Sequence, residues 1–510
     1  MLLFTSFTAT YAQKSQNSDF AHVCLGFITQ KQRENTSRRQ RVNSNRDIRE
    51  KEGITLRKLY DENKIDYNGL LYPSKAMFAL LIPIVIEQFL NSFMGMMDTM
   101  MVSNVGSEAI SAVSLVDSIN NLVIQIFAAM ASGAAIICSQ YLGSKRQDLS
   151  NKAAKQVVLT VLVISLSLTL FGLILRRPLL RLVFGQIEEG VMAQSQIYFL
   201  ITVLSYPFLA MFNAGAAFFR AGGNSKFPMK VSVVSNLLNI SGNAFLIFGL
   251  GLGVAGAAAA TLVSRVFSAV VIFAFLRKSR QPIVVRDYLA IRPDMPLIWK
   301  ILAIGIPSGI ENGMFQFGKL AIQSTVSTMG TQAIAAQAMT NILESVNGIA
   351  GVGIGIGLMT MVGQAIGAGR KEEAKYYIVK CTRLGLAGIL ISCLCVLGIC
   401  KPVTWLAGME PASAKMCFEM VAAITIAKPL FWAFSFVPAY GMRAAGDVRF
   451  SMITSTVTMW CLRVALCVFL VRVFRMGPMA VWYGMFTDWA VRSVVFFCRF
   501  RSGRWMKQSV

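Results

Sequence analysis

The stretch "LLIPIVIEQFLNSFMGMMDTMMVS", from Leu80 to Ser103, decides the fold class. It is long and apolar enough to cross about 30 Å of hydrocarbon as a helix. It nevertheless contains Glu87 and Asp98, and carboxylates are costly at membrane depth. Similar runs recur along the 510 residues, of which 55% are hydrophobic and only 15% charged, too little polar surface for a soluble protein of this size. We therefore expect an all-α polytopic membrane protein.

Twelve apolar runs are present, and we expect each to form one membrane span. Their limits are 77–103, 112–140, 154–175, 192–219, 228–249, 254–276, 297–327, 333–364, 377–399, 415–441, 450–471 and 478–498. The predicted domains are an N-lobe bundle (73–276), a cytoplasmic linker (277–296) and a C-lobe bundle (297–500). A disordered basic cytoplasmic tail (1–72) and a basic C-terminal tail (501–510) flank them.

The two halves are duplicated. "IPIVIEQ" at Ile82 matches "IPSGIEN" at Ile306, which lies 224 residues later (306 minus 82). "VSNVGSEAISA" matches "VSTMGTQAIAA" and "SQYLGSKR" matches "GQAIGAGR" at the same offset, while "FRAGGNSKF" matches "MRAAGDVRF" one residue out of step. Because six spans is an even number, both halves insert with the same orientation. We expect two six-helix bundles related by a pseudo-two-fold axis along the membrane normal, with a cleft between them.

The basic residues indicate orientation and compartment. The net charge is +24, and Lys and Arg concentrate in the even-numbered loops, the linker and the tails. This pattern favours an inner (cytoplasmic) membrane location with both termini cytoplasmic and contact with anionic lipid, and it argues against a nucleic-acid partner. The ten cysteines include no CxxC pair and the only histidine is His22, so no disulfide or His-ligated metal is expected in the spans.

The two acids of the first span share one helix face. Glu87 and Asp98 are eleven residues apart. At 100° per residue, their side chains point in directions that differ by only about 20°, and Asn91 lies between them on the same face. A carboxyl group withdrawn from water can hold a proton or bind a bare cation, so Glu87 and Asp98 are candidates for H⁺ or Na⁺ coupling. The alternative is that each lies near a helix end and reaches water or backbone.

Further polar residues recur at helical spacing in two other spans. Asn239 and Asn243 are one turn apart in the fifth span, where amides either join helices or ligate a cation. In the seventh span Asn312, Gln316 and Lys319 follow Glu311, the repeat partner of Glu87. The candidate substrate-cleft residues, for which ordinary helix packing is the alternative, are Met94, Met97, Glu311, Asn312, Gln316 and Lys319.

The halves are chemically unequal. Asp98 corresponds to Ile322 and Asn239 to Arg463, so the N-lobe is acidic at depth and the C-lobe basic. Four more ionisable residues lie in spans and are either structural pairs or site residues, namely Asp117, Arg265, Glu344 and Asp488.

The ensemble of motifs resembles the multidrug and toxic compound extrusion (MATE) family of bacterial type. It comprises twelve spans in 6+6 halves, Pro83 fifteen residues before Asp98-Thr99, "VG…AISAVSL", the Q-x-x-G ends of spans two and eight, and "NISGN" in span five. The resemblance covers about residues 75–500. It implies export of organic cations and other drugs driven by Na⁺ or H⁺, with Asp98, Asn239 and Asn243 at the coupling site, a possible Na⁺ ligand set, and Pro83 as a helix bend. The seventh span lacks the deeper glutamate of many members and the tenth offers Lys428 but no acid at depth, which places a C-lobe cation site in doubt.

We therefore expect a monomeric secondary antiporter that exports amphiphilic, cationic drugs or toxic metabolites in exchange for H⁺ or Na⁺, with no other cofactor. A lipid-linked sugar flippase of the same superfamily is the alternative, which Lys319 and Arg463 keep open. An enzyme is disfavoured because the spans contain no histidine and no catalytic pair. A channel is disfavoured because prolines interrupt spans at related places in both halves.

Overall fold

The computed structural model describes residues 59–185, 188–278, 281–286 and 291–507. The chain divides into Met1–Asp61 and Glu62–Val510, and everything below concerns the second unit. The predicted tail therefore lies outside the described residues up to residue 58, as do parts of the predicted linker and the last three residues.

The N-lobe is built from six spans. They are α3 (Ser74–Ser103), α4 (Ser107–Gly143), α5 (Gln147–Ile174), the pair α7 (Glu189–Leu204) and α8 (Tyr206–Ala221), α9 (Lys226–Asn243) with the π-helical η3 (Ala244–Gly249), and α10 (Gly253–Leu276). The α7–α8 pair bends by 42° and corresponds to the single run predicted at 192–219. The sequence analysis missed α6 (Arg176–Phe184), a short helix with three arginines that follows α5.

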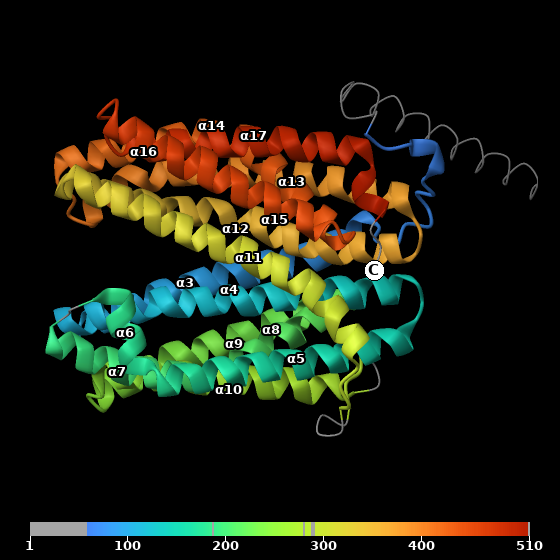
Figure 1. Ribbon diagram of the computed structural model, residues 1–510, viewed down its shortest axis with the longest axis horizontal. Coiled ribbons are helices and arrows are strands. Elements are labelled where there is room, and N and C mark those ends of the chain that lie inside the picture. The colour runs from blue at the N-terminus through green and yellow to red at the C-terminus, as the bar shows by residue number, and fades with distance from the viewer. Residues whose placement is uncertain (1–58, 186–187, 279–280, 287–290, 508–510) are drawn as a thin grey trace, which may run out of the picture. The chain divides into compact units, whose positions relative to one another are not determined.

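The C-lobe repeats this order. Its spans are α11 (Met295–Val326), α12 (Thr331–Gly367), α13 (Lys371–Leu406), α14 (Pro411–Ala444), α15 (Val448–Val457) continued by the π-helical η6 (Thr458–Val464) and α16 (Ala465–Arg472), and α17 (Met479–Ser502). Single-turn 3₁₀ helices are η2 (Glu62–Lys64), η5 (Ser327–Met329) and η7 (Arg504–Lys507). Figure 1 places α3 to α10 in one bundle and α12 to α17 in the other, with α11 running obliquely beside α4. The prediction of an all-α protein with two six-helix bundles is confirmed.

The outer faces of the helices are suited to lipid. In the described part of the chain, nine helices are long and apolar enough to cross a membrane, and the bent α7–α8 pair makes a tenth. Large apolar side chains such as Leu170, Ile174 and Ile391 are exposed on these faces. A helix satisfies its backbone hydrogen bonds internally, which is why apolar runs form helices in hydrocarbon.

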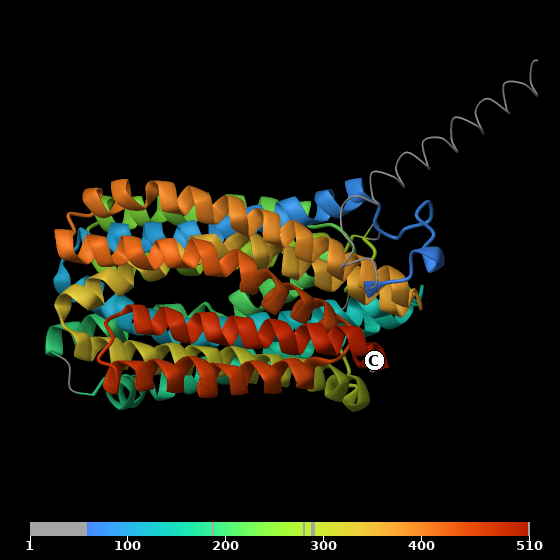
Figure 2. The same ribbon diagram turned by 90° about the horizontal axis from the view of Figure 1, so that it is seen from above.

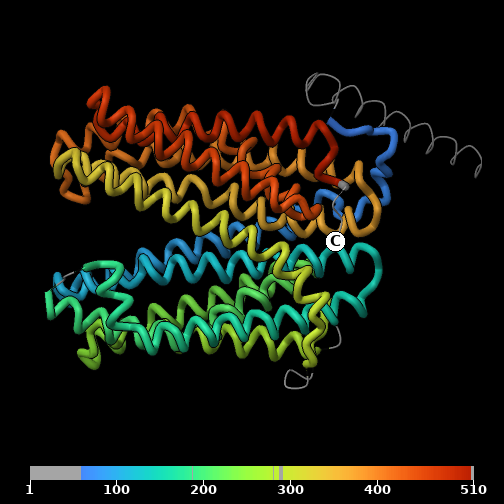
Figure 3. The backbone as a smooth tube through the Cα atoms, in the orientation of Figure 1, coloured from blue at the N-terminus to red at the C-terminus, as the bar shows by residue number. Residues whose placement is uncertain are grey.

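The lobes meet through repeat-related contacts. α4 packs against α11, and their repeat counterparts α12 and α3 also pack against each other, which is the pattern that a pseudo-two-fold axis produces. The tube in Figure 3 shows the same two-part arrangement, whereas in Figure 2, seen from above, the helices of the two bundles overlap. The chain passes from α10 to α11 at one end of the bundles, at the right in Figure 1, and we call this the linker end.

At the linker end the lobes are in close contact. Gln140 of α4 donates to the carbonyl of Ala444 at 2.8 Å, and its repeat counterpart Gln364 of α12 donates to the carbonyl of Ala221 at 2.7 Å. A Cβ atom at Gly143 would clash with the backbone of Gln364, and one at Gly367 would clash with the backbone of Gln140. Glycine is required at both positions because the two backbones touch there.

The residues before α3 are held at this end as well. The backbone N–H groups of Leu71 and Tyr72 donate to Glu373 and Tyr377 of α13, and Arg370 donates to the carbonyl of Gly69 at 2.6 Å. Ordered contacts thus begin before residue 73, where the N-lobe boundary was predicted. At the start of α11, Asp294 caps the helix by accepting from the N–H of Leu297, and the nearby ammonium of Lys152 lowers the pKa of the Asp294 carboxyl.

Candidate functional site: two repeat-related pockets of opposite charge

A pocket in the N-lobe brings Asp98 together with a second carboxylate. Its volume is about 490 Å³, and Asp98 and Asp117 line it with Arg265 as the cation. The wall from α3 also includes Asn91, which belongs to the polar stripe predicted on that helix, and Met94, a predicted cleft residue. The volume falls in the range of small-molecule sites.

The predicted coupling residues lie in one hydrogen-bonded series. Nδ2 of Asn243 donates to Asp98 Oδ1 at 2.6 Å and to Asn239 Oδ1 at 3.3 Å. Asn239 in turn donates to Thr261 Oγ1 at 3.1 Å. Both asparagines are fully buried, and Asn243 Oδ1 has no hydrogen-bond partner among the described residues. Asp98 and Asn243 thus present the oxygen ligands that a hard cation such as Na⁺ prefers. The α-helix α9 ends at Asn243, and the π-helical η3 begins at the next residue.

The other N-lobe groups form further hydrogen bonds; the sequence singled out Asp117 and Arg265 but not their partners. Asp117 accepts from Asn120 at 3.1 Å and from the Tyr198 hydroxyl at 3.3 Å. The Tyr206 hydroxyl donates to Asn120 Oδ1 at 2.7 Å, and Arg265 donates to the Ser205 hydroxyl at 2.6 Å. The bend between α7 and α8 at Ser205 lies beside these hydrogen bonds, and of the two tyrosines Tyr198 lines the pocket.

Glu87 is not part of this pocket. Glu87 is 3% exposed, and Nη1 of Arg220 donates to both oxygens of its carboxylate at 3.1 Å. Glu311, its repeat partner, is likewise paired with Arg443 and accepts from the Ser455 hydroxyl at 2.8 Å. Two repeat-related ion pairs thus give both glutamates a structural explanation, and we leave them out of the site proposed below.

A second pocket lies in the C-lobe. Its volume is about 360 Å³, and Gln316 and Lys319 line it, together with Glu344 and Arg463. Among the described residues the lining of neither pocket includes Met97 or the candidate cleft residues Glu311 and Asn312; the Asn312 amide donates instead to the carbonyl of Gln125 at 3.4 Å. Pro83 is buried within α3, as Pro307 is within α11.

The second pocket is the repeat counterpart of the first. Seven residue pairs that line the two pockets are separated by 224 positions: Gly95 and Lys319, Asp98 and Ile322, Thr99 and Gln323, Val113 and Gln337, Asp117 and Asn341, Asn120 and Glu344, Asn121 and Ser345. Both acids of the N-lobe pocket are therefore replaced by neutral residues, and a glycine is replaced by a lysine. Ser118 and Asn121 line both pockets, so the two are neighbours across α4.

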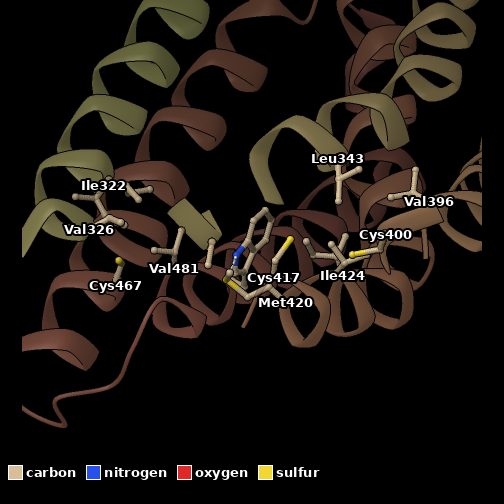
Figure 4. Packing of buried hydrophobic residues seen from close by; sticks show 14 of the residues in the cluster. Ile322, Val326, Leu343, Val396, Cys400, Cys417, Met420, Ile424, Cys467 and Val481 are labelled. Atoms are coloured by element: carbon tan, nitrogen blue, oxygen red, sulfur yellow. Dashed lines mark hydrogen bonds between the residues drawn. The ribbon is translucent and has the colours of Figure 1, made fainter. Parts of the chain in front are cut away.

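Two residues that line the C-lobe pocket, Glu344 and Arg463, belong to buried ion pairs. Glu344 pairs with Lys428, which is fully buried, at 2.5 Å. Asp488 is shared by Arg463 at 2.6 Å and Arg492 at 2.9 Å. The sequence analysis singled out Asp488 but missed Arg492, although the spacing of four residues on one helix was the available signal. Ile322 and Val481 line the pocket and also belong to the apolar cluster of Figure 4, which fixes the position of the pocket wall.

Comparisons with known proteins agree with this architecture. The sequence profile of the MatE family matches residues 83–245 and 307–469, two segments that together cover more than half of the chain and repeat at the same 224-residue offset. The "Uncharacterized transporter YisQ" of Bacillus subtilis is 27% identical over 85% of this chain and 96% of its own length. The "Probable multidrug resistance protein NorM" of Thermotoga maritima is 26% identical over 86% and 94%.

Solved structures share the fold. A crystal structure of MATE in complex with MaD3S superposes with a TM-score of 0.79 at 19% identity, covering 88% of this chain and 98% of the other. A transporter of the MOP superfamily from Pyrococcus furiosus, described as having a binding pocket of reverse polarity, superposes with a TM-score of 0.77 at 19% identity and the same coverage. The two profile matches, together with the two six-helix bundles, show that this chain belongs to the MatE family of transporters.

Proposed function

We propose that this protein is a secondary antiporter that exports amphiphilic organic cations in exchange for H⁺ or Na⁺. The linker end faces the cytoplasm, because the basic loops gather there, and the protein lies in the inner membrane as a monomer surrounded by lipid. The names of the NorM relatives support multidrug export. One observation carries the proposal: Asp98 lines the N-lobe pocket and is hydrogen-bonded to Asn243, which continues to Asn239.

The arrangement explains how the exchange works. With Asp98 ionised, the N-lobe pocket holds two carboxylates against one arginine and attracts a cationic compound. When H⁺ or Na⁺ neutralises Asp98, this attraction weakens and the hydrogen bond to Asn243 must rearrange. The repacking of α3 about Pro83 then accompanies release. A cation and a drug that exclude one another in this way are coupled by about 1–3 kcal/mol, which is a factor of about 5 to 150 in affinity.

Ethidium transport into everted membrane vesicles tests the proposal. An inside-acid or an inside-high Na⁺ gradient is imposed on vesicles that contain the native chain or Asp98→Asn. We expect one of the two gradients to drive uptake in the native protein and Asp98→Asn to lose most of that gradient-dependent uptake, because the variant no longer has a carboxylate that the cation can neutralise. Glu108→Gln is the matched control, since it removes an exposed carboxylate of the N-lobe that does not line either pocket. Native-level coupled uptake by Asp98→Asn contradicts the mechanism, and uptake indifferent to both gradients contradicts antiport.

A second candidate function is a flippase for lipid-linked sugars. Lys319 and Arg463 in the C-lobe pocket favour it, because such lipids carry phosphate. The same vesicles distinguish the two functions, since a flippase leaves ethidium uptake unchanged whatever the gradient.

A further inference from the structure

Arg265 of α10 differs from the other arginines that the bundles enclose. Within the described ranges, every other arginine that is not solvent-exposed pairs with a carboxylate; these are Arg220, Arg443, Arg463, Arg492 and Arg499. Arg265 is half-buried, yet it donates to the neutral hydroxyl of Ser205 and forms no ion pair with any described residue. A guanidinium does not lose its proton, and a charge withdrawn from water needs compensation. For Arg265 that compensation comes from the pocket that it lines.

The N-lobe pocket contains two carboxylates, and neither has a cationic partner. Asp98 accepts from an amide, and Asp117 accepts from an amide and a tyrosine hydroxyl. Neither acid forms an ion pair with a residue in the part of the chain that the structure describes. With both acids ionised, the two carboxylates and the guanidinium of Arg265 sum to −1 (−2 plus +1). The lining thus balances one further monovalent cation and no more.

Arg265 lies beside the series of hydrogen bonds that contains Asp98. Thr261, one helical turn before Arg265 on α10, lines the same pocket and accepts from Asn239. Because no ion pair ties Arg265 to a single acid, its charge acts on both carboxylates across the pocket. Charges in such a partly buried site interact several times more strongly than in bulk water.

The size of the pocket does not by itself prevent two cations from binding together. The volume is about 490 Å³. A water-sized ion occupies about 30 Å³, so an ion and an organic cation fit in it side by side. Exclusion of one by the other must therefore be electrostatic, and the charge that produces it is the one that Arg265 contributes.

We propose that Arg265 is a fixed counter-cation that limits the N-lobe pocket to one exchangeable positive charge, so that the coupling ion and the organic cation exclude one another. This inference rests on the proposed antiport and names the residue that enforces the exchange. Without Arg265, the two carboxylates sum to −2 and hold the ion and the drug at the same time. The carrier then moves both in one direction, and the gradient no longer drives export.

The affinity of the purified full-length protein for rhodamine 123, a cationic dye, tests the inference. Fluorescence polarisation is measured in phosphatidylcholine nanodiscs with and without Na⁺ at constant pH, and against pH without Na⁺. In the native protein one of these cations should weaken dye binding about 5- to 150-fold. In Arg265→Gln that weakening should fall to about twofold or less, so that with the cation present the variant binds the dye about tenfold more tightly than the native protein. A merely structural defect would weaken dye binding under both conditions.

Three further variants connect the effect to charge. Arg265→Lys keeps the cation and should keep the dependence. Arg265→Gln combined with Asp117→Asn returns the lining to −1, with Asp98 alone, and should restore the dependence to within about threefold of native. Asp117→Asn alone leaves a neutral lining and should weaken dye binding about tenfold even without the cation. The matched control is Arg383→Gln, which removes an exposed arginine of α13 that lines neither pocket.

The two proposals fail in different ways. Native cation dependence in Arg265→Gln, or a double variant that behaves like Arg265→Gln, overturns the role of Arg265 and leaves the antiport standing. Gradient-driven ethidium uptake at the native rate by Arg265→Gln overturns that role as well. A native protein whose dye affinity responds to neither cation contradicts the antiport itself, and the role of Arg265 falls with it.

Discussion

The two lobes share a scaffold and differ in the charge of the pocket that each one carries. In the N-lobe, Asp98 and Asp117 are held by amides and hydroxyls, so their charge is solvated by neutral donors. In the C-lobe, Glu344 and Asp488 are held by full positive charges. A carboxylate held by neutral groups can change its charge state at modest cost, whereas one locked between cations cannot. Under the proposed function, this difference assigns ion exchange to the N-lobe and a fixed network of ion pairs to the C-lobe.

The largest expected effect comes from breaking the fixed network. Asp488→Asn leaves the buried guanidinium groups of Arg463 and Arg492 without their shared anion. We expect it to lower the free energy of unfolding by about 3–5 kcal/mol, measured by SDS titration of the purified protein. Asp117→Asn is the matched change in the N-lobe, where only neutral donors lose a charged acceptor, and should cost about 1 kcal/mol. Equal losses in the two variants would remove the distinction between the lobes.

The repeat-related glutamates should behave alike in both lobes. Glu87→Gln and Glu311→Gln each remove the partner of a largely buried arginine, so we expect each to lower the free energy of unfolding by about 2–3 kcal/mol in the same titration. Neither should change which gradient drives ethidium uptake. If Glu87→Gln folded but its ethidium uptake no longer depended on the gradient, Glu87 would belong to the coupling site, as the sequence analysis proposed.

The smallest effect is expected where the lobes touch. Gly143→Ala and Gly367→Ala each introduce a methyl group against the backbone of the other lobe, which should destabilise the closed linker end by about 1–3 kcal/mol. Spin labels at Arg146→Cys and Lys371→Cys, with the exposed cysteines replaced, report the separation by double electron–electron resonance. We expect a longer distance in both variants. An unchanged distance would show that the glycine contact does not hold this end together.

Much of the fold was present in the sequence because hydrophobic length and repetition are local properties. The runs at 77–103 and 254–276 predicted α3 and α10 to within a few residues. The helix α6 was missed because a segment of nine residues with three arginines is too short and too polar for a membrane span and was interpreted as a loop. The bend between α7 and α8 was accessible, because Pro207 interrupts the apolar run next to the break at Ser205.

The site was less accessible to sequence analysis because its partners come from distant segments. The series from Asp98 through Asn243 to Asn239 joins residues that the family resemblance had named. Lys428 was noted as an isolated cation, and only the structure shows that Glu344 neutralises it. One signal was overlooked: the motifs "IPIVIEQ" and "FRAGGNSKF" recur together in both halves, and they contain Glu87 and its partner Arg220.

The central claim is that Asp98 exchanges a cation for cargo within the N-lobe pocket. Rhodamine 123 affinity of the purified full-length protein, measured against Na⁺ at constant pH and against pH without Na⁺, tests it most directly. The account predicts that one of these cations weakens dye binding about 5- to 150-fold in the native protein, and that Asp98→Asn binds weakly whether or not the cation is present. If Asp98→Asn retained the native dependence on that cation, Asp98 would not be the exchanging group.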